Sequence, residues 1–228
     1  MEGPPTGGAA DAAAPDEQVV DVPERWPATA SEVVFESTRV VSVRRDTVAP
    51  PSGGEPFIRD VVVHPGAVGV IALDEEMRVL VVHQYRHPVG HRLVEAPAGL
   101  LDHPGEPYHE AVARELYEEG HVTAADWRVL VDYFTSPGMT NETLRVYVAR
   151  GIRAVPEHER HAGDDEEADM PTAWVPLDEL VRRVLAGELH NPTLCVGVLA
   201  TWVAVHGDGI DALRPAQAPW PAREAVPR

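Results

Sequence analysis

Three glutamates on one face of a single predicted helix constrain this chain more than any other feature. A helix is predicted over residues 106–119, because Pro107 suits a first turn and apolar residues recur there at helical spacing. These apolar residues are Ala111, Val112 and Leu116. Glu115 precedes Glu118 by three residues and Glu119 by four, so the three carboxylates project from one side. Like charges at this spacing repel by roughly a few tenths of a kcal/mol per pair, which favours a bound cation over a purely structural role.

Magnesium suits these carboxylates, because Mg²⁺ favours octahedral oxygen ligands and often shares its coordination sphere with substrate phosphates. The turn at Ala98 and Gly99 lies upstream of the helix, where a backbone carbonyl can approach the same metal. Arg114 adjoins the carboxylates and could hold one of them by a bidentate pair. Taken alone, an acidic helix face is more usually just solvated. The wider pattern of residues decides between the two interpretations.

The stretch from Gly99 to Val122 resembles the Nudix box, G-x5-E-x7-R-E-U-x-E-E-x-G-U, in which U is apolar. The matching residues are Gly99, Glu106, Arg114, Glu115, Leu116, Glu118, Glu119 and Val122. Two positions depart from it: six residues, not five, separate Gly99 from Glu106, and His121 stands where the final glycine would be. We expect the loop to tolerate its extra residue and the left-handed helix cap to move back to Gly120. All the carboxylates remain, so the departures do not indicate an inactive enzyme.

The resemblance extends from roughly residue 33 to residue 207. Over this range the sequence is similar to the ADP-ribose pyrophosphatase branch of the Nudix hydrolases. Three segments carry it: HPGAV at 64–68, HQYRHP at 83–88 and EAPAG at 95–99. Pro137 follows Val122 by fifteen residues, as a proline does in that branch. The resemblance implies a Nudix-type α/β/α sandwich, an α/β fold with a mixed sheet, preceded by an N-terminal β-strand extension.

The resemblance also implies roles for particular residues. The metal ligands would be Ala98, through its carbonyl, Glu115, Glu118 and Glu119, holding Mg²⁺ or alternatively Mn²⁺. The substrate-binding residues would be Arg86, Arg59 and Pro137, although Arg86 is equally well explained as a surface arginine at a strand end. Glu118 would also act in catalysis. The general base would be Glu166 or Glu167, in the acidic stretch GDDEEADM at 163–170, which could otherwise be a solvated loop.

The pattern along the chain predicts four parts: a disordered arm at 1–30, a β extension at 31–64, a folded domain at 65–210 and a flexible tail at 211–228. The resemblance implies that the folded domain is the hydrolase and that the extension serves dimerisation. Trp220 is the one tail residue that could dock locally. We expect one long strand over 32–45, then a strand over 57–64. Strands at 67–73 and 79–84 are expected to form a buried hairpin. Later elements are strands at 127–134, 143–148 and 172–175, and helices at 177–185 and 191–207.

Composition excludes several other classes of protein. The net charge of −18 disfavours direct binding to nucleic acid, which relies on clustered Lys and Arg. Cys195 is the single cysteine, so the chain has neither an internal disulfide nor a cysteine zinc site. Histidine pairs with ligand-like spacing lack the H-E-x-x-H pattern of zinc enzymes. With no apolar run of ~18–20 residues and no secretory signal, we expect a cytoplasmic protein that does not bind membranes.

The expected function is Mg²⁺-dependent hydrolysis of the diphosphate bond of ADP-ribose to AMP and ribose 5-phosphate by a homodimer. Another nucleotide-sugar or dinucleotide pyrophosphatase is the first alternative, because the box reports diphosphate chemistry and not the attached group. A non-catalytic Nudix domain that senses such ligands is the second. The full set of carboxylates and the negative charge weigh against a DNA-binding regulator.

Overall fold

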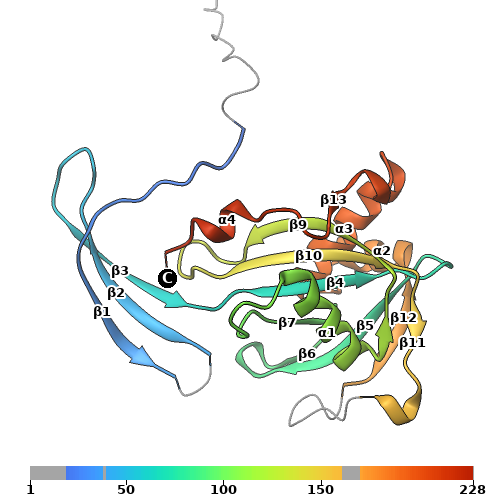
Figure 1. The fold of residues 1–228 in the computed structure, drawn as a ribbon. Coiled ribbons are helices and arrows are strands. Elements are labelled where there is room, and N and C mark those ends of the chain that lie inside the picture. The colour runs from blue at the N-terminus through green and yellow to red at the C-terminus, as the bar shows by residue number, and fades with distance from the viewer. Residues whose placement is uncertain (1–18, 38–39, 161–169, 228) are drawn as a thin grey trace, which may run out of the picture.

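A mixed five-stranded sheet in the order β13-β9-β10-β4-β7 forms the centre of the computed structural model, which describes residues 19–37, 40–160 and 170–227 (Figure 1). Its strands are β4 (Ala67–Ala72), β7 (Ala98–Leu100), β9 (Asp126–Phe134), β10 (Thr143–Arg150) and β13 (Arg214–Pro215). β4 and β10 run parallel, and the other neighbours are antiparallel. A parallel pair at the centre of a sheet is covered on both faces, which explains why all of β4 is buried.

Helices cover both faces of this sheet. The helices are α1 (Tyr108–Gly120) on one face, and α2 (Leu177–Leu185) and α3 (Pro192–His206) on the other. A second sheet, in the order β12-β5-β6, consists of β5 (Arg78–Arg86), β6 (His91–Glu95) and β12 (Thr172–Pro176). The shorter elements are η1 (His87–Val89), β8 (Val122–Thr123), β11 (Arg153–Ala154), η2 (Glu157–Glu159), η4 (Ile210–Ala212) and α4 (Pro221–Glu224).

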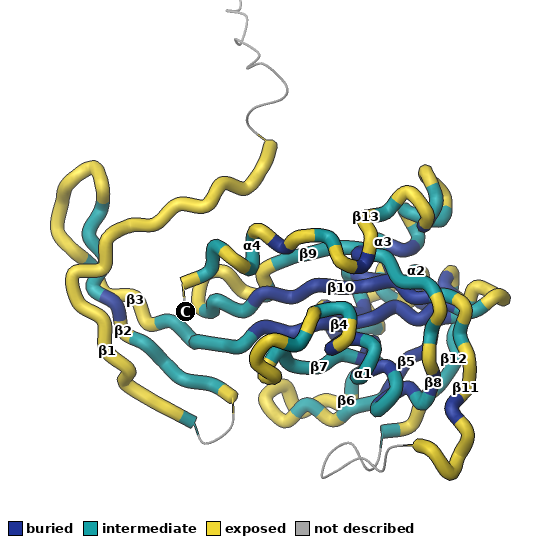
Figure 2. Tube along the Cα trace, viewed as in Figure 1, coloured by how far each residue is buried: buried dark blue, intermediate teal, exposed yellow. Residues whose placement is uncertain are grey.

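The period-two alternation of β10 divides the interior into two apolar clusters. Val146 and Val148 face the cluster that contains α2 and α3, whereas Tyr147 and Ala149 face the cluster that contains α1. Both clusters show as dark blue along β4 and β10 in Figure 2. The layers are therefore helix, sheet and helix, which confirms the predicted α/β/α sandwich.

The first three strands form a separate antiparallel sheet beside this sandwich (Figure 1). They are β1 (Ala28–Glu36), β2 (Ser42–Val48) and β3 (Phe57–Val63), and we call this sheet the extension. The strand predicted over 32–45 is in fact two, because the chain reverses where the Ser37 N–H donates to the Val41 carbonyl at 2.9 Å. β1 also begins at Ala28, inside the segment predicted to be a disordered arm.

Two further predictions were wrong. β4 and β5 are not a hairpin: one bridge joins Leu73 to Val79, and otherwise β4 pairs with β10 and β7 while β5 pairs with β6 and β12. The segment predicted as a flexible tail packs on the sandwich, where β13 pairs with β9 and Trp220 is only 1% exposed. Sequence composition missed this packing because its main partner, Arg145, lies 75 residues upstream in β10.

The predicted helices over 177–185 and 191–207 are confirmed as α2 and α3. Asn191 caps α3 by accepting a hydrogen bond of 2.9 Å from the Leu194 N–H, and Pro192 follows as the first helical residue. Within residues 19–37, 40–160 and 170–227, no helix is long and apolar enough to cross a membrane.

Candidate active site

Helix α1 carries its carboxylates on the side that faces β7. Ala111, Val112 and Leu116 are fully buried against the sheet and anchor the helix. Glu115 and Glu119 are each only 9% exposed, which is unusual for glutamates. The predicted helix is therefore confirmed, and two of its glutamates lie largely shielded from bulk water.

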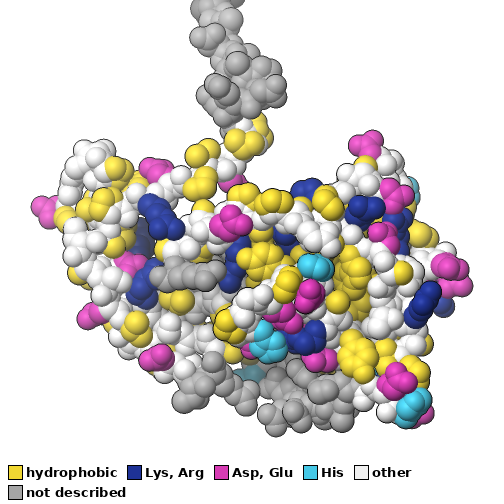
Figure 3. Space-filling view, viewed as in Figure 1, with side chains coloured by type: hydrophobic (Ala, Val, Ile, Leu, Met, Phe, Trp, Pro, Cys, Tyr) yellow, Lys and Arg dark blue, Asp and Glu magenta, His cyan; other side chains and the backbone are white. Residues whose placement is uncertain are grey.

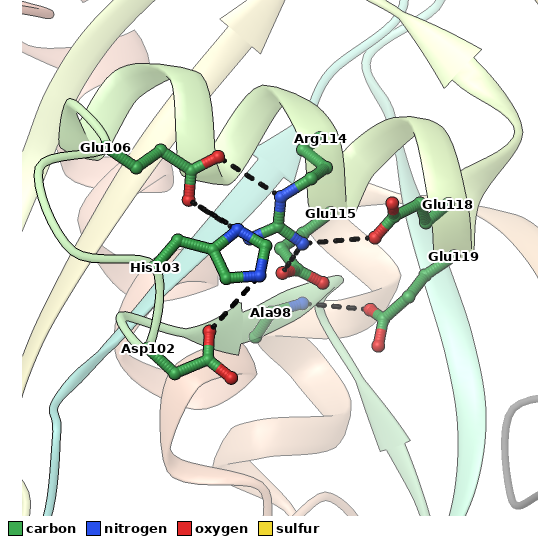
Figure 4. A network of polar contacts seen from close by, with 8 residues as sticks. All are labelled: Ala98, Asp102, His103, Glu106, Arg114, Glu115, Glu118 and Glu119. Carbon is green, nitrogen blue, oxygen red and sulfur yellow. Dashed lines mark hydrogen bonds and ion pairs between the residues drawn. The ribbon is translucent and has the colours of Figure 1, made fainter. Parts of the chain in front are cut away.

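Arg114 lies at the centre of the carboxylates (Figure 4). Its Nε and Nη2 each donate to an oxygen of Glu106 at 3.2 Å, which makes the pair bidentate. Its Nη1 donates to Glu115 Oε1 at 2.6 Å and to Glu118 Oε2 at 3.1 Å. The prediction that Arg114 holds a neighbouring glutamate is confirmed, and one guanidinium in fact orients three of them.

Ala98 and Gly99, which the sequence placed in a turn, lie in β7 and contact the carboxylates. The Ala98 N–H donates to Glu119 Oε2 at 2.9 Å, which places this residue beside the carboxylates. The role of its carbonyl as a metal ligand stays a prediction. Gly99 has no room for a side chain: a Cβ there would lie 1.9 Å from Cδ of Glu115. The first glycine of the box is therefore required by the close approach of the Glu115 carboxylate.

The electrostatics of this group reflect the crowding of carboxylates around one guanidinium. Hydrogen bonding to Arg114 holds the pKa of Glu106 below its usual range. The same hydrogen bond raises the pKa of Arg114, which therefore stays charged. Four carboxylates, those of Glu106, Glu115, Glu118 and Glu119, lie in a group that contains a single arginine, so the group carries excess negative charge.

The donor set fits Mg²⁺ chemically, because it consists of carboxylate oxygens on a rigid helix with excess negative charge. In the part of the chain that the structure describes, no three carboxylate, histidine or cysteine side chains converge on one point as they stand. Arg114 Nη1 donates to both Glu115 and Glu118, so one guanidinium holds two of these carboxylates (Figure 4).

Arg86, a predicted substrate-binding residue, ends β5 and forms a bidentate pair with Glu95. Its Nε and Nη2 donate to the two carboxylate oxygens at 2.9 and 2.8 Å, and Glu95 is 2% exposed. Sequence reasoning assigned no role to Glu95, although it opens the EAPAG segment that leads to Ala98. The Arg86 side chain is 42% exposed, so a buried carboxylate fixes the orientation of an arginine that lies partly at the surface of a strand end.

The other predicted substrate residues lie toward the extension. Arg59, on β3, places its guanidinium 4.4 Å from the centre of the Phe57 ring and donates to the Ile58 carbonyl. Pro137 is exposed in the loop between β9 and β10, where the Met139 carbonyl accepts from the Val62 N–H at 2.8 Å. A single chain therefore groups these two with the extension and not with α1. Glu166 and Glu167 lie outside the described residues.

The end of α1 differs from the prediction. His121, and not Gly120, adopts the left-handed cap conformation, with φ of 53° and its N–H donating to the Tyr117 carbonyl. Gly120 stays helical, and its surroundings are tightly packed, since a Cβ there would lie 2.7 Å from Cδ2 of Leu80. The cap thus keeps the position that the box assigns to glycine.

Known proteins with similar sequences support the assignment that this geometry suggests. The NUDIX domain model matches residues 63–194, more than half of the chain. An α/β/α sandwich with this carboxylate helix defines a class of diphosphate-processing domain, and the chain belongs to the Nudix family.

The chain is 46% identical to an ADP-ribose pyrophosphatase of Mycobacterium tuberculosis over 78% of this chain and 84% of that protein. It is 34% identical to a methanol dehydrogenase activator of Bacillus methanolicus, over 74% of this chain and 88% of that protein. A crystal structure of an ADP compounds hydrolase matches with a TM-score of 0.69 at 20% identity, covering 83% of this chain and 99% of the other. That last similarity shows a shared fold.

Proposed function

We propose that this chain hydrolyses the diphosphate bond of ADP-ribose and releases AMP and ribose 5-phosphate. The observation that carries the proposal is the carboxylate face of α1, with Glu115 against Gly99 and Glu119 on the Ala98 N–H. The relative that is 46% identical over most of its length and is named ADP-ribose pyrophosphatase supports the choice of substrate.

Each residue of the site has a role in this proposal. Glu115, Glu118, Glu119 and the Ala98 carbonyl would hold Mg²⁺, with Mn²⁺ as the alternative. When bound, the metal supplies charge neutralisation and Lewis-acid polarisation of the diphosphate. Arg114 keeps Glu115 and Glu118 oriented.

The substrate contacts are proposed on the same basis. Arg86, fixed by buried Glu95, binds a phosphate oxygen of the diphosphate. Glu166 or Glu167 takes the proton of the attacking water. A positioned base typically contributes ~10²–10⁴-fold to the rate, so substitution of the right glutamate will be easy to recognise.

A homodimer that forms through the extension belongs to the proposal. Its strands expose large apolar side chains, with Val33 62%, Phe35 57% and Ile58 59% exposed, and hydrophobic side chains lie at the surface of this region (Figure 3). A second copy would cover them and bring Arg59 and Pro137 toward a complete site. Light scattering of the wild type and of Phe35→Asp tests this, and a monomeric wild type contradicts it.

The deciding experiment is chromatography of products after incubation with ADP-ribose and Mg²⁺, with Glu119→Gln as control. Stoichiometric AMP and ribose 5-phosphate, lost in the control, support the reaction. If the folded protein leaves ADP-ribose intact, NADH, nucleotide sugars and dinucleoside polyphosphates are tested next. Turnover of one of these supports another pyrophosphatase, and no turnover supports a sensing domain.

A further inference from the structure

The last described residues, Arg214–Pro227, cross the sandwich as an ordered segment that we call the C-terminal strap. It begins as β13 on the edge of the central sheet and ends just beyond α4 (Figure 1). Two contacts fix its end: Arg223 Nη1 donates to Thr143 Oγ1 at 3.1 Å, and Asn141 Nδ2 donates to the Pro227 carbonyl at 3.1 Å. The strap therefore spans from β9 to the loop before β10.

A fully buried arginine holds the middle of the strap. Arg145 on β10 pairs with Asp132 at 2.7 and 3.0 Å and donates to the strap carbonyls of Ala218 and Pro219 at 2.7 and 2.9 Å. Its guanidinium carbon lies 4.7 Å from the centre of the Trp220 ring. Two hydrogen bonds and the ring contact would be lost if the strap moved away, so Arg145 holds this segment against β10.

Trp220 contacts the start of the carboxylate helix. Its ring is 5.2 Å from that of Tyr108, the first residue of α1, at an interplanar angle of 84°. This helix has Pro107 at its N-cap and no capping side chain, so the usual local means of fixing a helix start is missing. A cavity of about 1060 Å³, lined by residues 101–109, the strap and the end of β1, borders the same turn. The start of α1 therefore has no side-chain cap of its own and is contacted by a distant segment, through the Tyr108 and Trp220 rings.

The start of α1 is connected to the carboxylates by one short route. Glu106 lies two residues before Tyr108 and is the bidentate partner of Arg114, which in turn holds Glu115 and Glu118. A shift of the first turn would move Glu106 and with it the guanidinium that orients the metal-binding carboxylates. Displacements of about 1 Å at a catalytic group can cost ~10²-fold in rate.

We propose that Trp220 is a positioning residue for catalysis, which fixes the start of α1 through Tyr108 and so keeps Glu106 and Arg114 in place. The inference rests on the proposed function and extends it to the C-terminal strap. A purely structural role for Trp220 would change stability alone.

A double-variant cycle tests this. Trp220→Leu, Tyr108→Leu and the double variant are compared in kcat, KM and hydrogen exchange at the Glu110 and Ala111 amides, which donate to the Pro107 carbonyl. Each single variant should lower kcat about 10-fold with KM nearly unchanged, and should speed exchange at these amides about 10-fold. The double variant should match Trp220→Leu, because both changes remove one contact.

Trp127→Leu is the matched control, since Trp127 packs edge-on against Tyr147 and its Nε1 donates to the Ala124 carbonyl, between β8 and β9. It should lower the melting temperature and leave kcat and α1 exchange unchanged. The proposal is overturned if the single variants keep wild-type kcat and exchange, or if their effects multiply in the double variant. If Trp220→Leu does not fold, Tyr108→Leu is used alone with the same measurements, because Tyr108 is only half-buried. If the wild type does not hydrolyse ADP-ribose, the proposed function fails, while the exchange rates still decide whether Trp220 fixes α1.

Discussion

The backbone N–H of Ala98 donates a hydrogen bond of 2.9 Å to Oε2 of Glu119, which lies 21 residues further along the chain. This contact joins β7 to the carboxylate face of α1 and fixes the position of the Glu119 carboxylate relative to β7. A neutral amide in place of the carboxylate still offers an oxygen to this N–H. The charge of Glu119 and its role in the fold can therefore be separated by experiment.

Glu119→Gln should lower kcat for ADP-ribose at least about 100-fold while the melting temperature stays close to that of the wild type. The amide keeps the hydrogen bond to Ala98 but is a poorer ligand for a hard cation. Steady-state assays of AMP release and thermal unfolding measure the two effects. Glu110→Gln, an exposed glutamate in the first turn of the same helix, is the control and should keep wild-type rates. Full activity in Glu119→Gln would remove this residue from the metal site.

Two glycine variants should differ in which property they change, the Mg²⁺ requirement or the stability. In Gly99→Ala the new Cβ displaces the Glu115 carboxylate, a flexible end, so the Mg²⁺ concentration needed for half-maximal activity should rise with little change in stability. In Gly120→Ala the Cβ meets buried Leu80, so stability should fall by about 1–3 kcal/mol with the Mg²⁺ requirement unchanged. Metal titrations and thermal unfolding of both variants check this. A wild-type Mg²⁺ requirement in Gly99→Ala would contradict the close approach of Glu115.

Stability should fall as the pH drops below about 6.5, in part because of His64. Burial lowers the pKa of this side chain, outweighing the nearby Glu142 carboxylate, while Arg223 acts in the same direction as burial. The Gly66 N–H donates to His64 Nδ1 at 3.1 Å, which requires the neutral ring. Because the folded pKa lies below the unfolded one, the unfolded chain takes up the proton first, and stability is lost as pH falls toward the folded pKa.

Chemical unfolding between pH 5 and pH 8 measures this slope, with His64→Gln as the comparison. The variant keeps a polar side chain but cannot titrate, so its stability should depend less steeply on pH. An equal slope in the variant and the wild type would assign the dependence to other groups.

His121→Gly should stabilise the protein by on the order of 0.5–1 kcal/mol, because a β-carbon is disfavoured at the φ of 53° found there. Part of that gain is offset by the greater freedom of glycine in the unfolded chain. His121→Ala, which keeps the β-carbon, should not share the gain. The melting temperatures of the wild type and the two variants test this prediction. The kcat should stay the same, because the carboxylates do not move. A lower melting temperature in His121→Gly would mean that the imidazole contributes more than its backbone strain costs.

Much of the site was predictable because its spacing is local. Glu115, Glu118 and Glu119 share a face through helix geometry alone, and Gly99 and Arg114 lie within the same short stretch. The left-handed cap was predicted at Gly120, one residue too early, because glycine favours that conformation, whereas the helix continues through Gly120 and the cap lies at His121. Glu95 gave no signal by itself, since its role depends on Arg86 in the adjacent strand.

Residue spacing of two, three and four determined the helices, several of the strands and the carboxylate face, whereas the α/β/α class was implied by the resemblance to the Nudix hydrolases. Tertiary structure alone decided which strands pair and where the C-terminal strap lies. β4 joins β10 instead of β5, and a segment rich in Pro and Ala becomes ordered because Trp220 covers the buried Arg145 charge. Strand pairing and the packing of the strap depend on the free energy of burying groups that are distant in sequence. This free energy cannot be inferred from the spacing of neighbouring residues.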